Sequence, residues 1–199
     1  MATRTELKEA SLNRILDVSA SRLRQEGLAG TAIADVMRDA GLTHGAFYVH
    51  FPNKTGLVVA ALRHALLENR KRWVGDLQPE SWRQRLQRLA RRYLTKAHRD
   101  DPANGCALAA LATEAARSDS LFRQAFEGEL LKSVQGIRSG NHAESGGSEQ
   151  QFDDALAFMA LCVGGLSLAR AVTDKELSER IMRACIEAAG RIASDTSPT

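Results

Sequence analysis

Residues 41–51 read GLTHGAFYVHF, and this stretch decides the expected fold. An apolar segment would belong to a core and a polar one to a loop, but here aromatic and histidine side chains mix within about two helical turns. Phe47 and Phe51 are spaced i, i+4 and share one face of a helix, whereas Tyr48 lies on another face. The pattern predicts a short helix that packs through one face and reads a partner through the other.

The flanking sequence predicts two helices before this stretch and a long one after it. The first helix has an apolar face made of Leu7, Leu12, Ile15, Leu16, Ser19 and Leu23. Small polar residues and glycines predict where helices begin and end, and Pro prevents a helix from continuing. We expect such positions at Gly27, Thr31, Gly41, Thr43, Pro52 and Asn53. Helix, glycine turn and short helix form the helix-turn-helix pattern, whose second helix enters the DNA major groove.

The whole chain is expected to be all-α. Its 199 residues are 44% hydrophobic and 26% charged, and strong helix formers recur throughout. Beyond Pro79, further helices are predicted over residues 81–98, 104–117, 119–138, 150–172 and 174–193. With the four N-terminal helices, this makes about nine.

Charge is distributed unevenly along the chain. Residues 1–75 hold 11 lysines and arginines against 7 aspartates and glutamates, whereas residues 76–199 hold 16 against 17. A basic excess around the helix-turn-helix pattern is compatible with nucleic acid as a partner. The apolar run 155–169 is shorter than the ~20 residues that cross a bilayer, and the first residues lack the apolar run of a signal peptide. We therefore expect a cytoplasmic protein with no membrane partner.

Sequence patterns typical of enzymes and metal sites are missing. Cys106, Cys162 and Cys185 lie far apart and form no CxxC pair, which argues against a disulfide framework and a zinc site. The five histidines show no HExxH motif, and no nucleotide-binding glycine loop occurs. No catalytic residue, metal ligand or cofactor is predicted.

A longer stretch, residues 27–62, carries a characteristic order of residues around the helix-turn-helix. In chain order these are Thr31, Ala40-Gly41, Thr43-His44-Gly45, Phe47-Tyr48, His50-Phe51 and Lys54. This order resembles the helix-turn-helix of the TetR family of bacterial transcriptional regulators. The chain departs from common choices of that family at three places: His44 stands where a Lys is frequent, Val49 where a His or Tyr is frequent, and Met37 where a small Ala is usual.

The resemblance implies how the head would hold DNA. Backbone phosphates would be contacted by Thr31, Thr43, Tyr48, His50 and Lys54, and the base edges would lie nearest His44, Gly45 and Val49. Phosphate contacts set the register, and base contacts carry the sequence information. Taken singly, each residue also has an ordinary structural interpretation as a helix cap, a half-buried aromatic or a solvated side chain. Their joint order favours DNA binding.

The resemblance further implies a DNA-binding domain at residues 1–53 and an effector-binding and dimerisation domain at residues 54–199. The residue pattern places an effector pocket among Trp82, Leu86, Leu89, Tyr93, Cys106, Ala110, Phe122, Phe126, Phe158 and Cys162, which alternatively form the core. A dimer interface is expected in the last two helices, at Leu161, Gly164, Gly165, Leu168, Ile181 and Cys185. There the glycines allow close helix approach, although they could equally accommodate packing inside one monomer.

Cys106 follows Asn104-Gly105 at an expected helix start, where backbone N–H groups favour a thiolate. Some regulators similar to this chain sense electrophiles or oxidants through a cysteine there; the alternative is a small buried packing residue. The function expected for the chain is a homodimeric repressor on a palindromic double-stranded DNA operator, released by a small lipophilic or electrophilic effector. An activator with the same head, a helical enzyme and a structural helical dimer are the alternatives.

Overall fold

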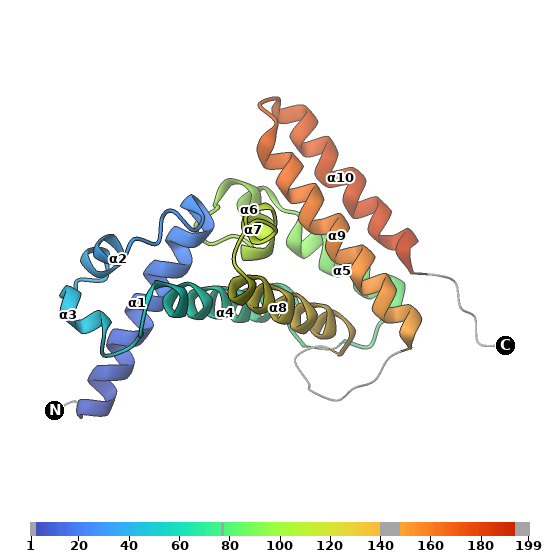
Figure 1. Ribbon diagram of the computed structural model, residues 1–199. Helices are drawn as coiled ribbons and strands as arrows, with labels where there is room; N and C mark the ends of the chain where they lie inside the picture. Colours follow the sequence, from blue (N-terminus) through green and yellow to red (C-terminus); the bar gives the residue numbers. More distant parts are fainter. Residues whose placement is uncertain (1–2, 77, 140–147, 194–199) are drawn as a thin grey trace. The chain divides into compact units, whose positions relative to one another are not determined.

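The computed structural model describes residues 3–76, 78–139 and 148–193, and this part of the chain is all-helical, as predicted (Figure 1). Ten helices follow one another along the described residues. They are α1 (Arg4–Glu26), α2 (Ile33–Asp39), α3 (His44–Phe47), α4 (Lys54–Trp73), α5 (Trp82–Tyr93), α6 (Lys96–Asp100), α7 (Ala107–Ala115), α8 (Ser120–Ser139), α9 (Glu149–Ala171) and α10 (Lys175–Ile192).

The predicted helix over residues 81–98 is interrupted, which raises the number of helices above the nine expected. α5 ends at Tyr93, and Leu94 leaves the helical conformation with φ −88° and ψ 72°. Thr95 then caps α6, because its hydroxyl oxygen accepts a hydrogen bond from the His98 N–H at 3.1 Å. A threonine hydroxyl caps from an extended backbone, so it competes with continuation of the helix.

The chain divides into two compact units. The first consists of Met1–Glu68 and Pro102–Glu129, and the second of Asn69–Asp101 and Leu130–Thr199. α4 and α8 therefore contribute residues to both units. The expected domains, residues 1–53 and 54–199, were divided by function, whereas the two compact units are divided by their internal contacts. The functional division stays a prediction.

The N-terminal head of the first unit, α1 to α3, has a core that meets the sequence prediction. The buried cluster consists of Ile15, Val36, Met37, Ala40, Phe47, Phe51 and Leu57. Phe47 and Phe51 thus pack against the first two helices, as their i, i+4 spacing predicted. Gly27 and Gly41 have φ values of 67° and 66°, a left-handed conformation that glycine adopts without steric cost, and they follow α1 and α2 as expected.

Two details of the predicted head are wrong. The N-cap of α2 is Ala32 and not Thr31, whose hydroxyl instead donates to the Leu28 carbonyl at 2.7 Å. Leu7, expected on the apolar face of α1, is 61% exposed. It lies in the first turn of α1, beyond the core residues, the first of which is Ile15.

The second unit is organised around α9 and α10, which run side by side in opposite directions (Figure 1). α10 also packs against α5. The buried residues of α9 are Asp154, Ala155, Phe158, Cys162, Gly165, Leu166 and Ala169. With 23 residues, α9 is longer than the apolar run 155–169 suggested, and by length and composition it could cross a membrane, a test that core helices of soluble proteins also pass.

Candidate DNA-binding site

α3 is a short helix that continues as a tight turn. Thr43 occupies its N-cap position, as predicted, although its side chain makes no capping hydrogen bond. After Phe47 the backbone forms i→i+3 hydrogen bonds, with Val49 N–H donating to the Ala46 carbonyl at 3.3 Å and His50 N–H donating to the Phe47 carbonyl at 2.9 Å. The short helix predicted between Thr43 and Pro52 is therefore one turn of α-helix that tightens at its end.

The two faces of α3 differ sharply in exposure. Phe47 is fully buried, whereas its neighbours Tyr48 and Val49 are 63% and 60% exposed. The Tyr48 ring stands edge-on to Phe47, with 5.1 Å between centroids, and 5.7 Å from the His44 ring. The exposed residues among the predicted contacts here are Thr43, His44, Gly45, Tyr48 and Val49. We call this set the α3 face.

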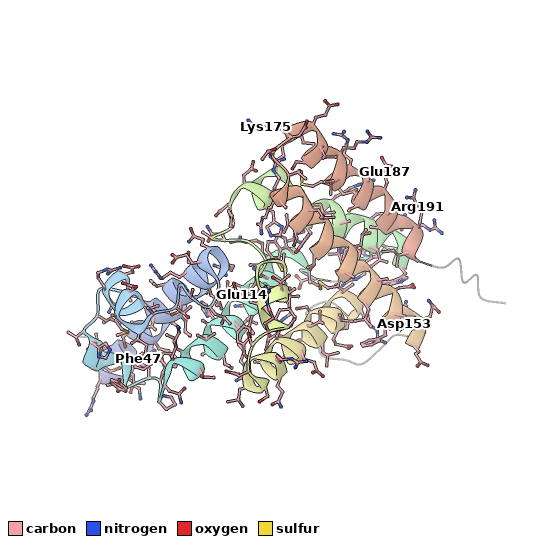
Figure 2. The ribbon with its side chains drawn as sticks, turned by 45° about the horizontal axis from the view of Figure 1, so that its top comes forward. Phe47, Glu114, Asp153, Lys175, Glu187 and Arg191 are labelled. Carbon is pink, nitrogen blue, oxygen red and sulfur yellow. The ribbon has the colours of Figure 1, made fainter. Side chains whose placement is uncertain are left out.

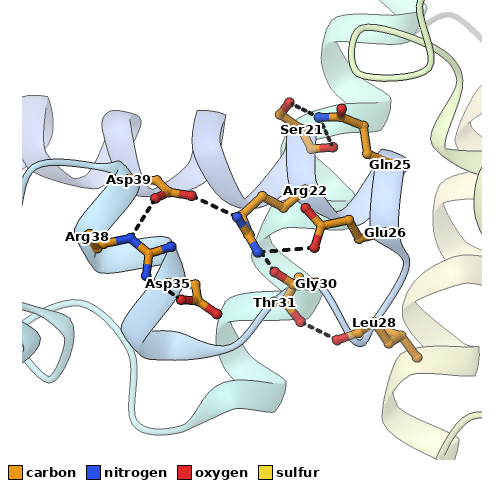
Figure 3. A network of polar contacts seen from close by, with 10 residues as sticks. All are labelled: Ser21, Arg22, Gln25, Glu26, Leu28, Gly30, Thr31, Asp35, Arg38 and Asp39. Atoms are coloured by element: carbon orange, nitrogen blue, oxygen red, sulfur yellow. Dashed lines mark hydrogen bonds and ion pairs between the residues drawn. The ribbon is translucent and has the colours of Figure 1, made fainter.

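A polar network that the sequence pattern did not predict joins α1 to α2 (Figure 3). Arg22 donates to the Gly30 carbonyl at 2.6 Å, to Asp39 at 2.7 Å and to Glu26 at 3.1 Å. Because Arg22 bonds both the turn before α2 and the end of α2, it holds that helix on α1 and so determines where α3 is presented. In the sequence, the i, i+4 spacing of Arg22 and Glu26 could have predicted their ion pair. It could not have predicted the bonds of Arg22 to Gly30 and Asp39.

His50, at the end of the turn after α3, is held against α1. Its Nε2 lies 2.9 Å from the Ser11 hydroxyl oxygen, and the Ser11 hydroxyl lies 2.8 Å from the Lys8 carbonyl oxygen. Burial, and secondly the charge of Lys8, lower the pKa of His50 below its ordinary value. A shallow hollow of about 710 Å³ lies beside His50, lined by Arg4, Thr5, Leu7, Lys8, Ser11, Ala46, Val49 and His50. Two cations of α1 therefore adjoin the α3 face.

The two remaining predicted phosphate contacts differ in accessibility. Lys54 is exposed in the first turn of α4, and Asn53 caps that helix as predicted, accepting the Gly56 N–H at 2.9 Å. Thr31 is fully buried and its hydroxyl is directed to Leu28. Thr31 therefore has no exposed hydroxyl with which to contact a phosphate, contrary to the expectation. We leave Thr31 out of the candidate site.

The predicted effector-pocket residues fall in both compact units. The first unit contains Cys106, Ala110, Phe122 and Phe126, and the second contains Trp82, Leu86, Leu89, Tyr93, Phe158 and Cys162. All of the second set are buried except Trp82, which is half-buried and donates its indole N–H to Asp154 at 2.8 Å. Such packing matches the alternative interpretation as core, and effector binding by these residues stays a prediction.

Two features of the first unit bear on effector binding. Phe122 lines a hollow of about 410 Å³ together with Leu28, Val58, Lys54 and Arg117, among other residues. Cys106 is the N-cap residue of α7, as its position after Asn104-Gly105 predicted, and it is 3% exposed.

A buried aromatic cluster in the second unit was not evident from the sequence. The His98 ring stacks on Trp73, with 4.1 Å between centroids, and meets Tyr93 edge-on at 4.6 Å. His98 Nδ1 lies 2.7 Å from the Tyr93 carbonyl oxygen, which accepts its hydrogen. Burial lowers the pKa of His98 to about 4, so the ring is neutral at physiological pH. The break between α5 and α6 brings Tyr93 and His98 together, which explains why helical spacing did not reveal the cluster.

The predicted dimer residues Gly164 and Gly165 have different surroundings. A methyl group on Gly165 would lie 2.6 Å from the Cys185 sulfur, whereas one on Gly164 would meet no atom within 4 Å. Gly165 thus allows α9 and α10 of the same chain to approach, which corrects the expectation that both glycines lie between two copies. Burial raises the pKa of the Cys185 thiol. Leu161 and Ile181 are half-buried, and Leu168 is 59% exposed.

Comparisons with known proteins agree with this geometry. Residues 15–61 match the family of bacterial regulatory proteins, tetR family, and no curated protein matches the chain. A TetR-family transcriptional regulator from Cytophaga hutchinsonii is 18% identical, with a TM-score of 0.68 over 98% of this chain and 100% of that one. The reduced form of E. coli NemR is 19% identical, with a TM-score of 0.68 over 94% and 100%. Bacillus subtilis FadR in complex with stearoyl-CoA is 15% identical, with a TM-score of 0.59 over 88% and 97%.

The sequence match and the structural likenesses cover different parts of the chain. The matched segment runs from Ile15 in α1 to Ala61 in α4, and so contains α2, α3 and the whole α3 face. The structural likenesses extend the common fold over nearly the whole chain. Residues 15–61 therefore match the helix-turn-helix head of the tetR family of bacterial regulatory proteins, and the chain as a whole has the fold of solved TetR-family regulators.

Proposed function

We propose that this protein is a homodimeric transcriptional repressor that binds a palindromic double-stranded DNA operator and leaves it when a small effector binds. The observation that carries the proposal is the α3 face, in which Tyr48 and Val49 are about 60% exposed directly beside the fully buried Phe47. One side of this turn holds the head together, and the other offers hydroxyl, imidazole and methyl groups. Such groups contact phosphates and base edges in a major groove.

Each residue has a role in the proposed complex with DNA. Thr43, Tyr48, His50 and Lys54 contact phosphates, whereas His44, Gly45 and Val49 lie nearest the bases. Val49 has no polar side-chain atom, so its direct readout is limited to apolar contact, for which the thymine methyl is the natural partner. In a dimer, two α3 helices enter successive major grooves about 34 Å apart, which requires a palindromic site.

The DNA-binding proposal is tested with purified protein and fluorescently labelled duplexes selected by it from a random-sequence pool. Fluorescence anisotropy across a salt series measures both affinity and the number of phosphates that the protein neutralises, because each neutralised phosphate releases counterions. Tyr48→Ala should abolish tight binding. Lys54→Ala should reduce the salt slope of the dimer by about two, because one phosphate at each of its two heads then keeps its counterions.

Arg63→Ala is the matched control for Lys54→Ala, because Arg63 is an exposed cation further along the same helix. It should leave both affinity and salt slope unchanged. Equal binding to every duplex, unaffected by Tyr48→Ala, would contradict the proposal.

The dimer proposal rests on a second apolar seam of α9. Ala157, Leu161, Gly164, Leu168 and Ala171 follow one another at spacings of four, three, four and three residues, and all are exposed or half-buried. This is the spacing at which helices pack side by side in a coiled coil, and a two-fold axis places the same seam on both copies. Covering the seam with a second copy also removes the apolar surface of α9 from water. That is consistent with a soluble, cytoplasmic protein without membrane contact.

The outer side of α10 contrasts with this seam. Figure 2 shows Glu187 and Arg191 projecting outward from α10, and both side chains are exposed. We therefore place the charged side of α10 toward solvent and the half-buried Ile181 near the edge of the dimer interface.

The effector is proposed to be lipophilic or electrophilic. Aromatic and aliphatic side chains dominate the predicted pocket residues, and charged groups are few among them. Of the structurally similar regulators, FadR was solved with stearoyl-CoA and NemR in a reduced form. An electrophile would act here at the thiol of Cys106, the N-cap residue of α7.

The cysteine proposal is tested by treating the protein with N-ethylmaleimide and measuring operator affinity. Modification should weaken binding in the wild type and in Cys185→Ser, whose half-buried thiol serves as the control, but not in Cys106→Ser. Alkylation of Cys106, verified by mass spectrometry, without any change in affinity would contradict a sensing role.

A further inference from the structure

The hydrogen bonds of Ser11 determine which nitrogen of His50 carries a hydrogen. The Ser11 hydroxyl lies 2.8 Å from the Lys8 carbonyl oxygen and 2.9 Å from His50 Nε2. A carbonyl oxygen can only accept, so the single hydrogen of the hydroxyl points to Lys8. Ser11 Oγ is then an acceptor toward His50, and His50 must donate to it through Nε2–H.

This arrangement limits what Nδ1 of His50 can do. A neutral imidazole carries a hydrogen on one nitrogen, so with the hydrogen on Nε2 the Nδ1 atom is an acceptor. A phosphate oxygen is also an acceptor. Neutral His50 held by Ser11 therefore has no hydrogen to offer a phosphate, whereas the imidazolium donates from Nδ1 and keeps its bond to Ser11.

The charges around His50 favour the neutral ring when no DNA is present. Arg4 and Lys8 of α1 line the adjoining hollow, and its lining among the described residues includes no Asp or Glu. Phe51, at the start of the next segment, contributes an uncharged ring with its centroid 6.3 Å away. His44, the other titratable ring of this region, stands against Tyr48. An arriving phosphate is negative, so it favours the imidazolium.

We propose that Ser11 is a positioning residue that makes the phosphate contact of His50 depend on its imidazolium form, which couples operator binding to the uptake of one proton per head. The inference rests on the proposed DNA-binding function and adds a regulated contact to it. The sign follows from linkage: the complex holds more protons than the free protein, so affinity rises as pH falls. As the pH falls, the affinity for DNA begins to rise near the pKa of His50 in the complex. It stops rising below the pKa of His50 in the free protein.

The tautomer is tested without DNA. In the ¹⁵N spectrum of histidine-labelled protein at a pH where the ring is neutral, His50 should show its hydrogen on Nε2. Ser11→Thr keeps the hydroxyl and should keep this signature, whereas Ser11→Ala should give the mixture of tautomers of a free imidazole. A wild-type protein with the hydrogen on Nδ1 would overturn the inference.

The coupling is tested by anisotropy with a duplex selected from a random pool, from about pH 5.5 to pH 8 at constant ionic strength. Wild-type affinity should fall by up to about tenfold per pH unit for each head, since one proton is linked to each His50–phosphate contact. Ser11→Thr should retain this slope. Ser11→Ala should lose most of it, because the freed neutral ring can place a hydrogen on Nδ1.

His44→Gln separates the two histidines of the head and should keep the slope, whereas His50→Gln should remove it. If no duplex is selected at any pH, the proposed function itself fails. If duplexes bind tightly but the affinity of the wild type does not change with pH, or Ser11→Ala keeps the wild-type slope, the coupling is wrong and the DNA-binding function stands.

Discussion

α3 and α9 each bury one face and leave the other uncovered, but the two uncovered faces differ in chemistry. The α3 face mixes a hydroxyl, an imidazole, a phenol and a valine. The uncovered seam of α9 consists of alanine, leucine and glycine. Polar donors and methyl groups suit contacts with the base edges and phosphates of DNA. A seam of small apolar side chains suits packing against the same helix of a second copy. Under the proposed function each uncovered face binds a partner, and the composition of the face indicates the chemistry of that partner.

The largest effect is expected where the buried side of α3 is removed. Phe47→Ala empties a fully buried site and should lower the free energy of unfolding by about 4 kcal/mol, as buried Phe→Ala changes do. DNA binding should disappear with it. Tyr48→Ala is the matched change on the exposed side, and it should abolish DNA binding while the free energy of unfolding falls by less than about 1 kcal/mol. Denaturant titration and anisotropy on both variants distinguish the two faces. Similar stability losses would mean that α3 has no free face.

The stability of the second unit, in which α6 packs on α9, should depend on pH through His98 of α6. Arg170 of α9 donates to the His98 carbonyl at 2.5 Å, and burial lowers the pKa of the His98 ring from 6.5 to about 4. The unfolded chain therefore takes up a proton before the folded one does. Stability should decline below the unfolded pKa of 6.5 and, near pH 4, should have fallen by about 3 kcal/mol through this group.

The measurement is the free energy of unfolding against pH in wild type, His98→Gln and His44→Gln. His98→Gln should remove this part of the pH dependence, although its stability at neutral pH also falls. His44→Gln, at an exposed position of α3, should keep the wild-type slope. An unchanged slope in His98→Gln would show that His98 does not titrate on unfolding.

The uncovered seam of α9 is probed with a charge. Leu168→Glu places a carboxylate on the seam in both copies and should raise the dimer dissociation constant at least about a hundredfold, because two leucine side chains, each worth ~1.5–3 kcal/mol when buried, are removed from the interface. Leu121→Glu is the matched control, since Leu121 of α8 is 61% exposed against 59% for Leu168. Sedimentation equilibrium should find a dimer in wild type and Leu121→Glu. A dimer of unchanged strength in Leu168→Glu would place the interface elsewhere.

The smallest effect on stability is expected from alanine substitutions at the adjacent glycines of α9. Gly164 and Gly165 lie on different faces of the helix, so the two substitutions compare these faces. Gly165→Ala should destabilise the fold by about 1–3 kcal/mol, because the new methyl meets the Cys185 sulfur. Cys185→Ala in the same chain should relieve part of this destabilisation. Gly164→Ala should stabilise the monomer by up to about 1 kcal/mol through helix propensity and weaken the dimer. The two alanines are checked by thermal unfolding, and equal effects would contradict the assignment of opposite faces.

The sequence by itself determined the helical class, most of the helices and the inward side of the head, but not the break between α5 and α6. Gly27 and Gly41 end helices, Asn53 begins one, and Phe47 and Phe51 face the core at i, i+4, as the structure confirms. These features were predictable because caps and helical spacing depend on residues within about one turn of each other. The exposed side of α3 followed from the same spacing.

Only the tertiary structure decided which polar groups meet. Ser11 and His50 are 39 residues apart, and Arg22 and Asp39 are 17 apart. The burial of Thr31 and the packing of Gly165 against Cys185 likewise depend on how helices cross. Helical periodicity states which residues share a face but not which face meets which. That choice is made by the sum of many weak contacts between distant segments, and it packs Gly165 against Cys185 of the same chain while the neighbouring Gly164 meets no atom within 4 Å.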